Sequence, residues 1–63
     1  MSVAEKRRVR IVLEKTDFGG YEYALHDAQS DIVLASGWSA GTKADARDEA
    51  RQDARRLGCE VVR

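Results

Sequence analysis

The sequence of 63 residues has no proline, a single histidine, a single cysteine and no long apolar run. One cysteine cannot form an intrachain disulfide, so a chain this short depends on a small core, and self-association is a reasonable expectation. A lone thiol without a secretory segment favours the reducing cytoplasm. The apolar runs are too short to cross a bilayer. Basic and acidic residues number 11 each, and this zero net charge argues against a general nucleic-acid binder.

The stretch from Thr42 to Leu57 predicts a helix. It has no glycine, no proline and no β-branched residue after Thr42, and most of its residues favour helix. Thr42 is suited to cap the first turn together with Asp45, and Gly58 is suited to end the helix. A narrow strip of apolar, mostly small residues would let this helix lie close to a sheet: Ala46, Ala50, Ala54 and Leu57.

Alternating or apolar segments on both sides of this stretch predict strands. We expect them from Arg8, over Tyr21–His26, over Ile32–Ser36 and over Cys59–Val62, with Gly37–Gly41 leading into the helix. The predicted fold is α+β, a three-stranded antiparallel meander with one helix on one face and a short C-terminal strand (β-β-β-α-β). It is a single domain over residues 1–63, with residues 1–6 flexible. The last strand pairs beside either the first or the third.

The alternation also predicts which side of the sheet the helix covers. The covered side is expected to hold Val9, Ile11, Leu13, Tyr23, Leu25, Ile32 and Leu34. The opposite side is expected to hold Arg8, Arg10, Val12, Glu14, Glu22, Ala24, His26, Val33 and Ala35. This second set mixes apolar and charged residues, so it is either solvated or a dimer or partner surface.

Two charged ridges run along the predicted helix. Arg47, Arg51 and Arg55 recur every four residues on one flank, and Asp45, Glu49 and Asp53 recur on the other. Solvation accounts for most such charge patterns, and a protein partner that contacts one ridge is the alternative. These six residues are the candidate partner-binding residues.

A basic cluster at the start of the first strand supports another hypothesis. Lys6, Arg7, Arg8 and Arg10, with Tyr21, Tyr23 and Trp38 as stacking groups, suggest nucleic-acid binding over the sheet. The alternative is that the three aromatic side chains supply the bulk that an alanine-rich helix lacks.

The chain offers little for catalysis or metal binding. Gly37–Gly41 matches the G-x-S-x-G pattern around Ser39, but the only histidine, His26, precedes this serine and the fold is too small for a hydrolase. His26 and Cys59 are too few for a zinc site within one chain. We therefore expect no enzyme, no cofactor and no metal.

The stretch R-I-V-L-E-K-T-D-F-G-G-Y-E-Y-A-L, followed later by G-T-K-A-D-A-R-D-E-A, resembles the N-terminal half of HicB-like antitoxins. The resemblance rests on Gly19, Gly20, Tyr21, Gly41, Thr42 and Ala46. It implies a dsRBD-like sheet that binds and blocks an mRNA-cleaving toxin, usually as an oligomer.

A second resemblance is to the YegP-like small domains. It is carried by Tyr23-Ala24-Leu25 and by the run from Ile32 to Ser39. That family has no settled activity, so this resemblance implies a fold and no function.

Together these patterns predict a non-enzymatic binding module that acts by protein–protein interaction, as an antitoxin-like or phage-type inhibitor of another protein. The alternatives are a nucleic-acid-binding accessory protein and a structural homodimer. The expected partner is a protein, with nucleic acid and a second copy as further candidates and no membrane.

Overall fold

A computed structural model describes residues 7–62 of the chain. The elements follow one another as β1 (Arg8–Lys15), β2 (Tyr21–Asp27), β3 (Val33–Ser39), α1 (Lys43–Arg56) and β4 (Glu60–Val61). The predicted α+β order, β-β-β-α-β, is confirmed. The expectation that residues 1–6 are flexible lies outside the described residues.

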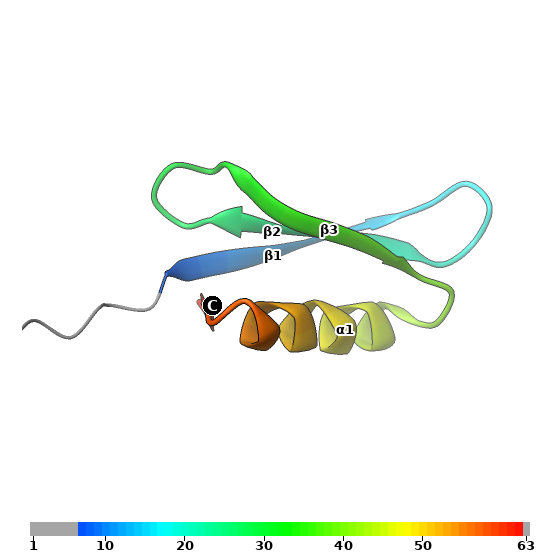
Figure 1. Ribbon diagram of the computed structural model, residues 1–63. Helices are drawn as coiled ribbons and strands as arrows, with labels where there is room; N and C mark the ends of the chain where they lie inside the picture. Colours follow the sequence, from blue (N-terminus) through cyan, green and yellow to red (C-terminus); the bar gives the residue numbers. More distant parts are fainter. Residues whose placement is uncertain (1–6, 63) are drawn as a thin grey trace, which may run out of the picture.

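The four strands form one sheet in the order β3-β2-β1-β4, and α1 lies along one face of it (Figure 1). β1–β2 and β2–β3 are antiparallel, as the meander requires. β4 pairs in parallel with β1, so of the two positions that the sequence left open, the last strand lies beside the first. The helix is the crossover that a parallel pair needs.

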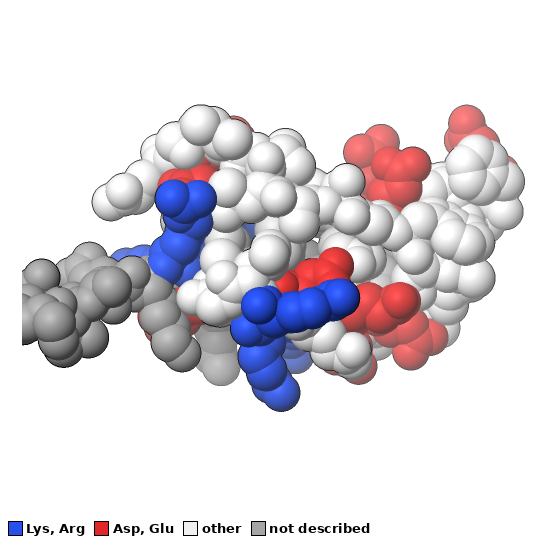
Figure 2. All heavy atoms as spheres, viewed as in Figure 1, with Lys and Arg blue, Asp and Glu red and all other residues white. Residues whose placement is uncertain are grey.

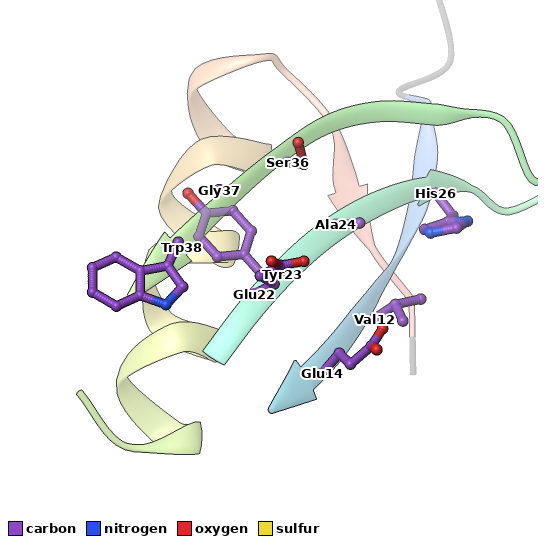
Figure 3. A pocket seen from close by; sticks show the side chains of 9 residues that line it. All are labelled: Val12, Glu14, Glu22, Tyr23, Ala24, His26, Ser36, Gly37 and Trp38. Atoms are coloured by element: carbon purple, nitrogen blue, oxygen red, sulfur yellow. The ribbon is translucent and has the colours of Figure 1, made fainter. Parts of the chain in front are cut away.

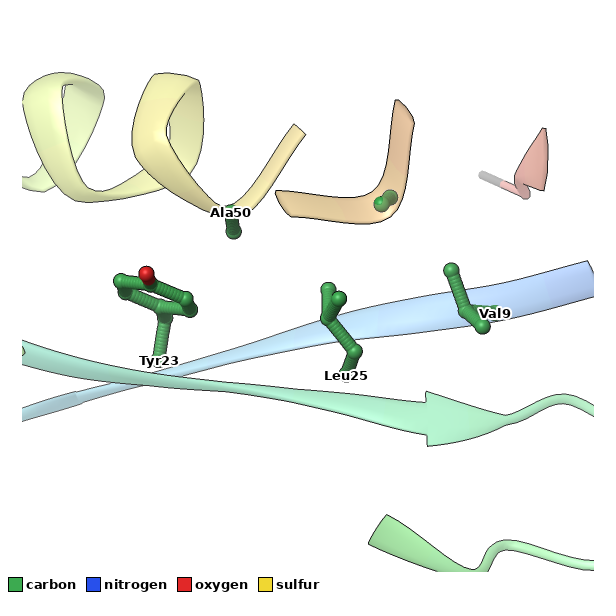
Figure 4. Packing of buried hydrophobic residues seen from close by; sticks show 5 residues of the cluster. Val9, Tyr23, Leu25 and Ala50 are labelled. Atoms are coloured by element: carbon green, nitrogen blue, oxygen red, sulfur yellow. The ribbon is translucent and has the colours of Figure 1, made fainter. Parts of the chain in front are cut away.

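The core lies between the sheet and α1 (Figure 4). Val9 and Leu25 are fully buried, and fully burying each of these side chains stabilises the fold by roughly 1.5–3 kcal/mol. Above them, the helix presents the buried methyl groups of Ala46, Ala50 and Ala54. The small residues therefore bring the helix close to the sheet, and the larger side chains come from the strands, as predicted.

Both ends of α1 follow the sequence signals. Thr42 is the N-cap, its side chain accepts from the Asp45 N–H, and the Asp45 carboxylate accepts from the Thr42 N–H at 2.9 Å. This reciprocal pair is a capping box. At the other end Leu57 is the C-cap, but its side chain is 55% exposed. The prediction that Leu57 extends the apolar strip is wrong, because the helix has ended there.

The third strand differs from its prediction. β3 begins at Val33 and continues to Ser39, so Gly37–Ser39 belong to the sheet and Ile32, 62% exposed, precedes the strand. The strand also contains a register shift, since Leu25 faces Ala35 but His26 faces Val33. Val33 and Leu34 lie on the sides predicted for them. The extra residue reverses the expected alternation from Ala35 on, so Ala35, predicted on the open side, packs against the core.

Tyr23 links the sheet to the helix. Its hydroxyl donates to Asp53 Oδ2 at 2.5 Å, and Asp53 also pairs with Arg56. A Cβ on Gly37 would collide with the Tyr23 ring, so the ring can cross β3 only over a glycine. The hydrogen bond to the carboxylate, aided by burial, raises the pKa of Tyr23 to about 12.

Candidate functional site

The face of the sheet away from α1, here called the open face, carries three cross-strand rows of side chains. Figure 3 shows two of these rows in full and His26 of the third. From the β2–β3 turn toward the β1–β2 hairpin, the rows are Arg10–His26–Val33, Val12–Ala24–Ser36 and Glu14–Glu22–Trp38. Because the middle row holds small side chains, the face has a shallow hollow there, lined by residues of all three strands.

The row nearest the hairpin, here called the acidic corner, consists of Glu14, Glu22 and Trp38. The two glutamates face each other directly across β1 and β2, and both are exposed. Among residues 7–62 neither carboxylate has a lysine, arginine or histidine within ion-pair distance. Like charges directly opposite each other in a sheet are destabilising, so folding alone does not favour this arrangement.

Trp38 is the aromatic member of the acidic corner and is 48% exposed. Its indole N–H donates to the Gly19 carbonyl at 3.3 Å, which fixes the ring against the hairpin. Gly20, in the left-handed region at φ 75°, leaves the space that the ring needs, because a Cβ there would lie 3.0 Å from ring atoms. The hairpin therefore positions an indole ring in line with two carboxylates, and all three groups attract a cation.

The opposite end of the open face is basic but internally paired. Arg10 forms an ion pair with Asp31, and His26 Nδ1 lies 3.3 Å from the same Asp31 oxygen without hydrogen-bond geometry. Asp27 closes the adjoining turn by accepting from the N–H groups of Ser30 and Gln29. These bonds, the one from Ser30 first, hold the pKa of Asp27 below its ordinary value.

The two helix ridges lie on the flanks of α1, where the sequence predicted them, and all six residues except the half-buried Asp53 are exposed. The ridges differ in their contacts. In the acidic ridge Asp45 belongs to the capping box and Asp53 binds Tyr23 and Arg56. Only Glu49 has no such contact within the described residues. The basic ridge is exposed at Arg47, Arg51 and Arg55, and the last two line a hollow beside β4.

The basic cluster at the start of β1 is divided by the fold. Lys6 lies outside the described residues. Arg7 lies 3.5 Å from Asp27, Arg10 pairs with Asp31, and Arg8 is exposed at the β4 side of β1. Two of the four cations therefore face carboxylates of the same chain.

Charge is distributed along the molecule (Figure 2). On the face shown, most acidic side chains lie over the half that contains the β1–β2 hairpin, and the visible basic side chains lie over the middle and the other half. Lys15 and Lys43 are at the hairpin end. The helix follows the same polarity, since its first turn carries Asp45 and its last turn carries Arg55 and Arg56. This arrangement suits the helix dipole at both ends.

The residues considered as catalytic or metal-binding groups lie apart from one another. Ser39 is buried at the hairpin end of β3 and accepts from the Gly41 N–H, whereas His26 lies at the other end of β2. Cys59 is a half-buried free thiol. Within residues 7–62 no three histidine, cysteine or carboxylate side chains gather as a metal site would require.

The acidic corner was not recognised from the sequence as a site. Its signal was present in part, because the Gly19-Gly20 turn sets Glu14 opposite Glu22. Trp38 was missed because the third strand was expected to end at Ser36. The prediction that both tyrosines and Trp38 fill space under the helix is therefore wrong for Trp38, which lies on the open face.

Comparison with known protein families, with curated proteins and with solved structures finds no match to this chain. No helix in the described part of the chain has the length and apolar character needed to cross a membrane.

Proposed function

We propose that this chain is a non-enzymatic binding module that occupies a basic surface on another protein. The acidic corner carries this proposal. Glu14 and Glu22 face each other without a cation among the described residues, next to the half-exposed indole of Trp38. A lysine or arginine side chain placed there would relieve the repulsion between the carboxylates and contact the ring face.

The chemistry of the partner follows from this complementarity. Proteins that bind nucleic acids expose clusters of lysine and arginine, so an acidic module can block them by covering that cluster. This role agrees with the resemblance to HicB-like antitoxins and with a phage-type inhibitor. The free thiol of Cys59 suits a reducing compartment, so we place the module in the cytoplasm.

The test compares three baits in a pull-down from native lysate at low salt. The first is the wild type, and the second has the acidic corner reversed by Glu14→Lys and Glu22→Lys. The third is a matched reversal of the helix ridge by Arg47→Glu, Arg51→Glu and Arg55→Glu. All three keep the core unchanged, and circular dichroism verifies that each bait is folded.

We expect the wild-type bait to recover a stoichiometric protein that has a basic surface, and nuclease treatment to leave this recovery unchanged. The corner variant should recover at least tenfold less of this protein, and the ridge variant should recover as much as the wild type. Loss only with the ridge variant would transfer the contact to the helix. Recovery that disappears after nuclease treatment would favour the nucleic-acid alternative and overturn the proposal.

A further inference from the structure

We propose that two copies of this chain pair through the free edge of β3 and form one continuous eight-stranded sheet. This inference concerns the edge of β3 rather than the two carboxylates of the acidic corner. It shares Trp38 with that corner and does not depend on the proposed function. Edge pairing extends the sheet in its own plane, so the open faces of both copies stay exposed.

The hydrogen-bond pattern identifies the free groups of the edge. Asp27 N–H donates to the Ile32 carbonyl at 2.8 Å, whereas the next residue, Ala28, donates to Arg8 at 2.9 Å. The backbone N–H and C=O groups of the odd-numbered residues of β2 are therefore directed toward β3. Those of their partners Ala35, Gly37 and Ser39 are directed toward β2. Ser36 and Trp38, which alternate with these partners, direct their N–H and C=O groups away from the sheet.

The two edges of the sheet are protected to different degrees. β4 has only two residues and is too short to be a template for pairing, and one of the two is the charged Glu60. β3 has seven residues, VLASGWS, and none is charged or proline. Lysine, proline, short length and β-bulges are the usual protection of an edge strand. Of these β3 has only the register shift between Val33 and Ala35, near its start. The rest of the strand, Ala35–Ser39, is a regular edge and is suited to strand addition.

The charges and the exposed apolar side chains favour a second copy of this chain as the partner of the β3 edge. Copies related by a twofold axis at Ser36 run antiparallel, so the acidic hairpin end of each lies beside the basic end of the other (Figure 2). The same axis brings Trp38 of each copy toward the Val33 end of the partner strand. Trp38 and Val33 are the two large apolar side chains that β3 exposes, and each lies near one end of the strand.

The experiment measures molar mass by sedimentation equilibrium from about 1 µM to about 1 mM protein. The wild type is expected to change from monomer to dimer within this range. Ser36→Pro removes an outward N–H for which residues 7–62 provide no partner, and Ser36→Lys sets two cations beside each other at the twofold axis. Each is expected to raise the dimer dissociation constant at least tenfold. Val12→Lys adds the same charge to the open face two strands away and is expected to dimerise as the wild type does.

Amide hydrogen exchange locates the contact in the same samples. The amides of Ser36 and Trp38 are expected to gain protection as the concentration rises, and those of the short edge strand β4 are not. A wild type that stays monomeric at the highest concentration overturns the proposal and leaves the edge to a different partner. Dimerisation that both Ser36 variants retain at wild-type strength, or that leaves these two amides unprotected, overturns it as well.

Discussion

The covered face and the open face of this sheet come from the same strands, yet they carry different kinds of side chain. Under α1, Val9, Tyr23 and Leu25 are buried against alanine methyl groups. One residue away along the same strands, the open face carries Glu22 and Val12, whose side chains are exposed. Successive side chains of a strand point to opposite faces of the sheet. The residues that stabilise the core and the residues available for binding can therefore change independently.

The largest effect is expected from the covered face. Leu25→Ala should destabilise the fold by about 2–5 kcal/mol, because it removes a fully buried side chain at the centre of the core. A domain of this size has little stability to lose. Val12→Ala, on the open face, is the control and should cost far less. Urea unfolding followed by circular dichroism measures both, and equal losses would contradict the division between the faces.

The helix side of the same core should resist added volume. Ala50→Leu should cost about 1–3 kcal/mol, because the methyl group of Ala50 is fully buried against the sheet and a larger side chain must push the helix away. Ala44→Leu places the same side chain on the exposed flank of α1 and should leave the melting temperature almost unchanged. A tolerated Ala50→Leu would show that the contact is loose.

Alkaline pH should weaken the link between the covered face and the helix. Tyr23 ionises near 10 in the unfolded chain and at about 12 in the folded one. The folded state therefore retains this proton where the unfolded state loses it, and stability falls as pH rises from 10 to 12.

The control for this pH dependence is Tyr23→Phe. It should cost roughly 1.5 kcal/mol at neutral pH by removing the hydrogen bond to Asp53. The difference in unfolding free energy between wild type and variant should then shrink across this interval. A difference that stays constant to the alkaline limit would exclude the hydrogen bond as its source.

The smallest effect is expected on the open face and has the opposite sign. Glu22→Gln should stabilise the fold by about 0.3 kcal/mol, because it removes one of two carboxylates that face each other across β1 and β2. Salt should reduce this gain by screening the repulsion. Asp48→Asn on the exposed surface of α1 is the control, because Arg51 three residues after it offsets Asp45 three residues before it, and it should give no such gain. Thermal unfolding at two ionic strengths compares the two variants.

Local signals predicted most of the fold. Thr42 with Asp45 fixed the start of α1, the alanine spacing fixed its buried side, and the alternation around Val9 and Leu25 fixed the covered face of β1 and β2. These features depend on residues close together in the chain. The pairing of β4 with β1 depends on two distant segments, and no local pattern selects between the two sheet edges.

The site was predicted less well, for a physical reason. The shift in pairing after Leu25 changes which residues of β3 face the core, and a single extra residue has no signal in composition or propensity. In addition, Trp38 was expected in the Gly37–Gly41 segment that leads into the helix, so the acidic corner could not be assembled. The helix ridges were visible in the sequence, as were the cap role of Asp45 and the i,i+3 pair of Asp53 with Arg56. The contact of Asp53 with Tyr23 was not, because it joins residues 30 positions apart.

The parallel pairing of β1 and β4 also determines how the molecule responds to force. The first residues of β1 and β4 lie side by side, Arg8 opposite Glu60. The hydrogen bonds that join the two segments include two at the ends of the pair, from Glu60 N–H to the Arg7 carbonyl at 2.7 Å and from Val62 N–H to the Val9 carbonyl at 2.9 Å. Pulling Arg7 and Val62 apart draws these strands past each other along their length, so both bonds are sheared together rather than opened one by one. The chain therefore has a small mechanical clamp, and forced unfolding begins with its rupture.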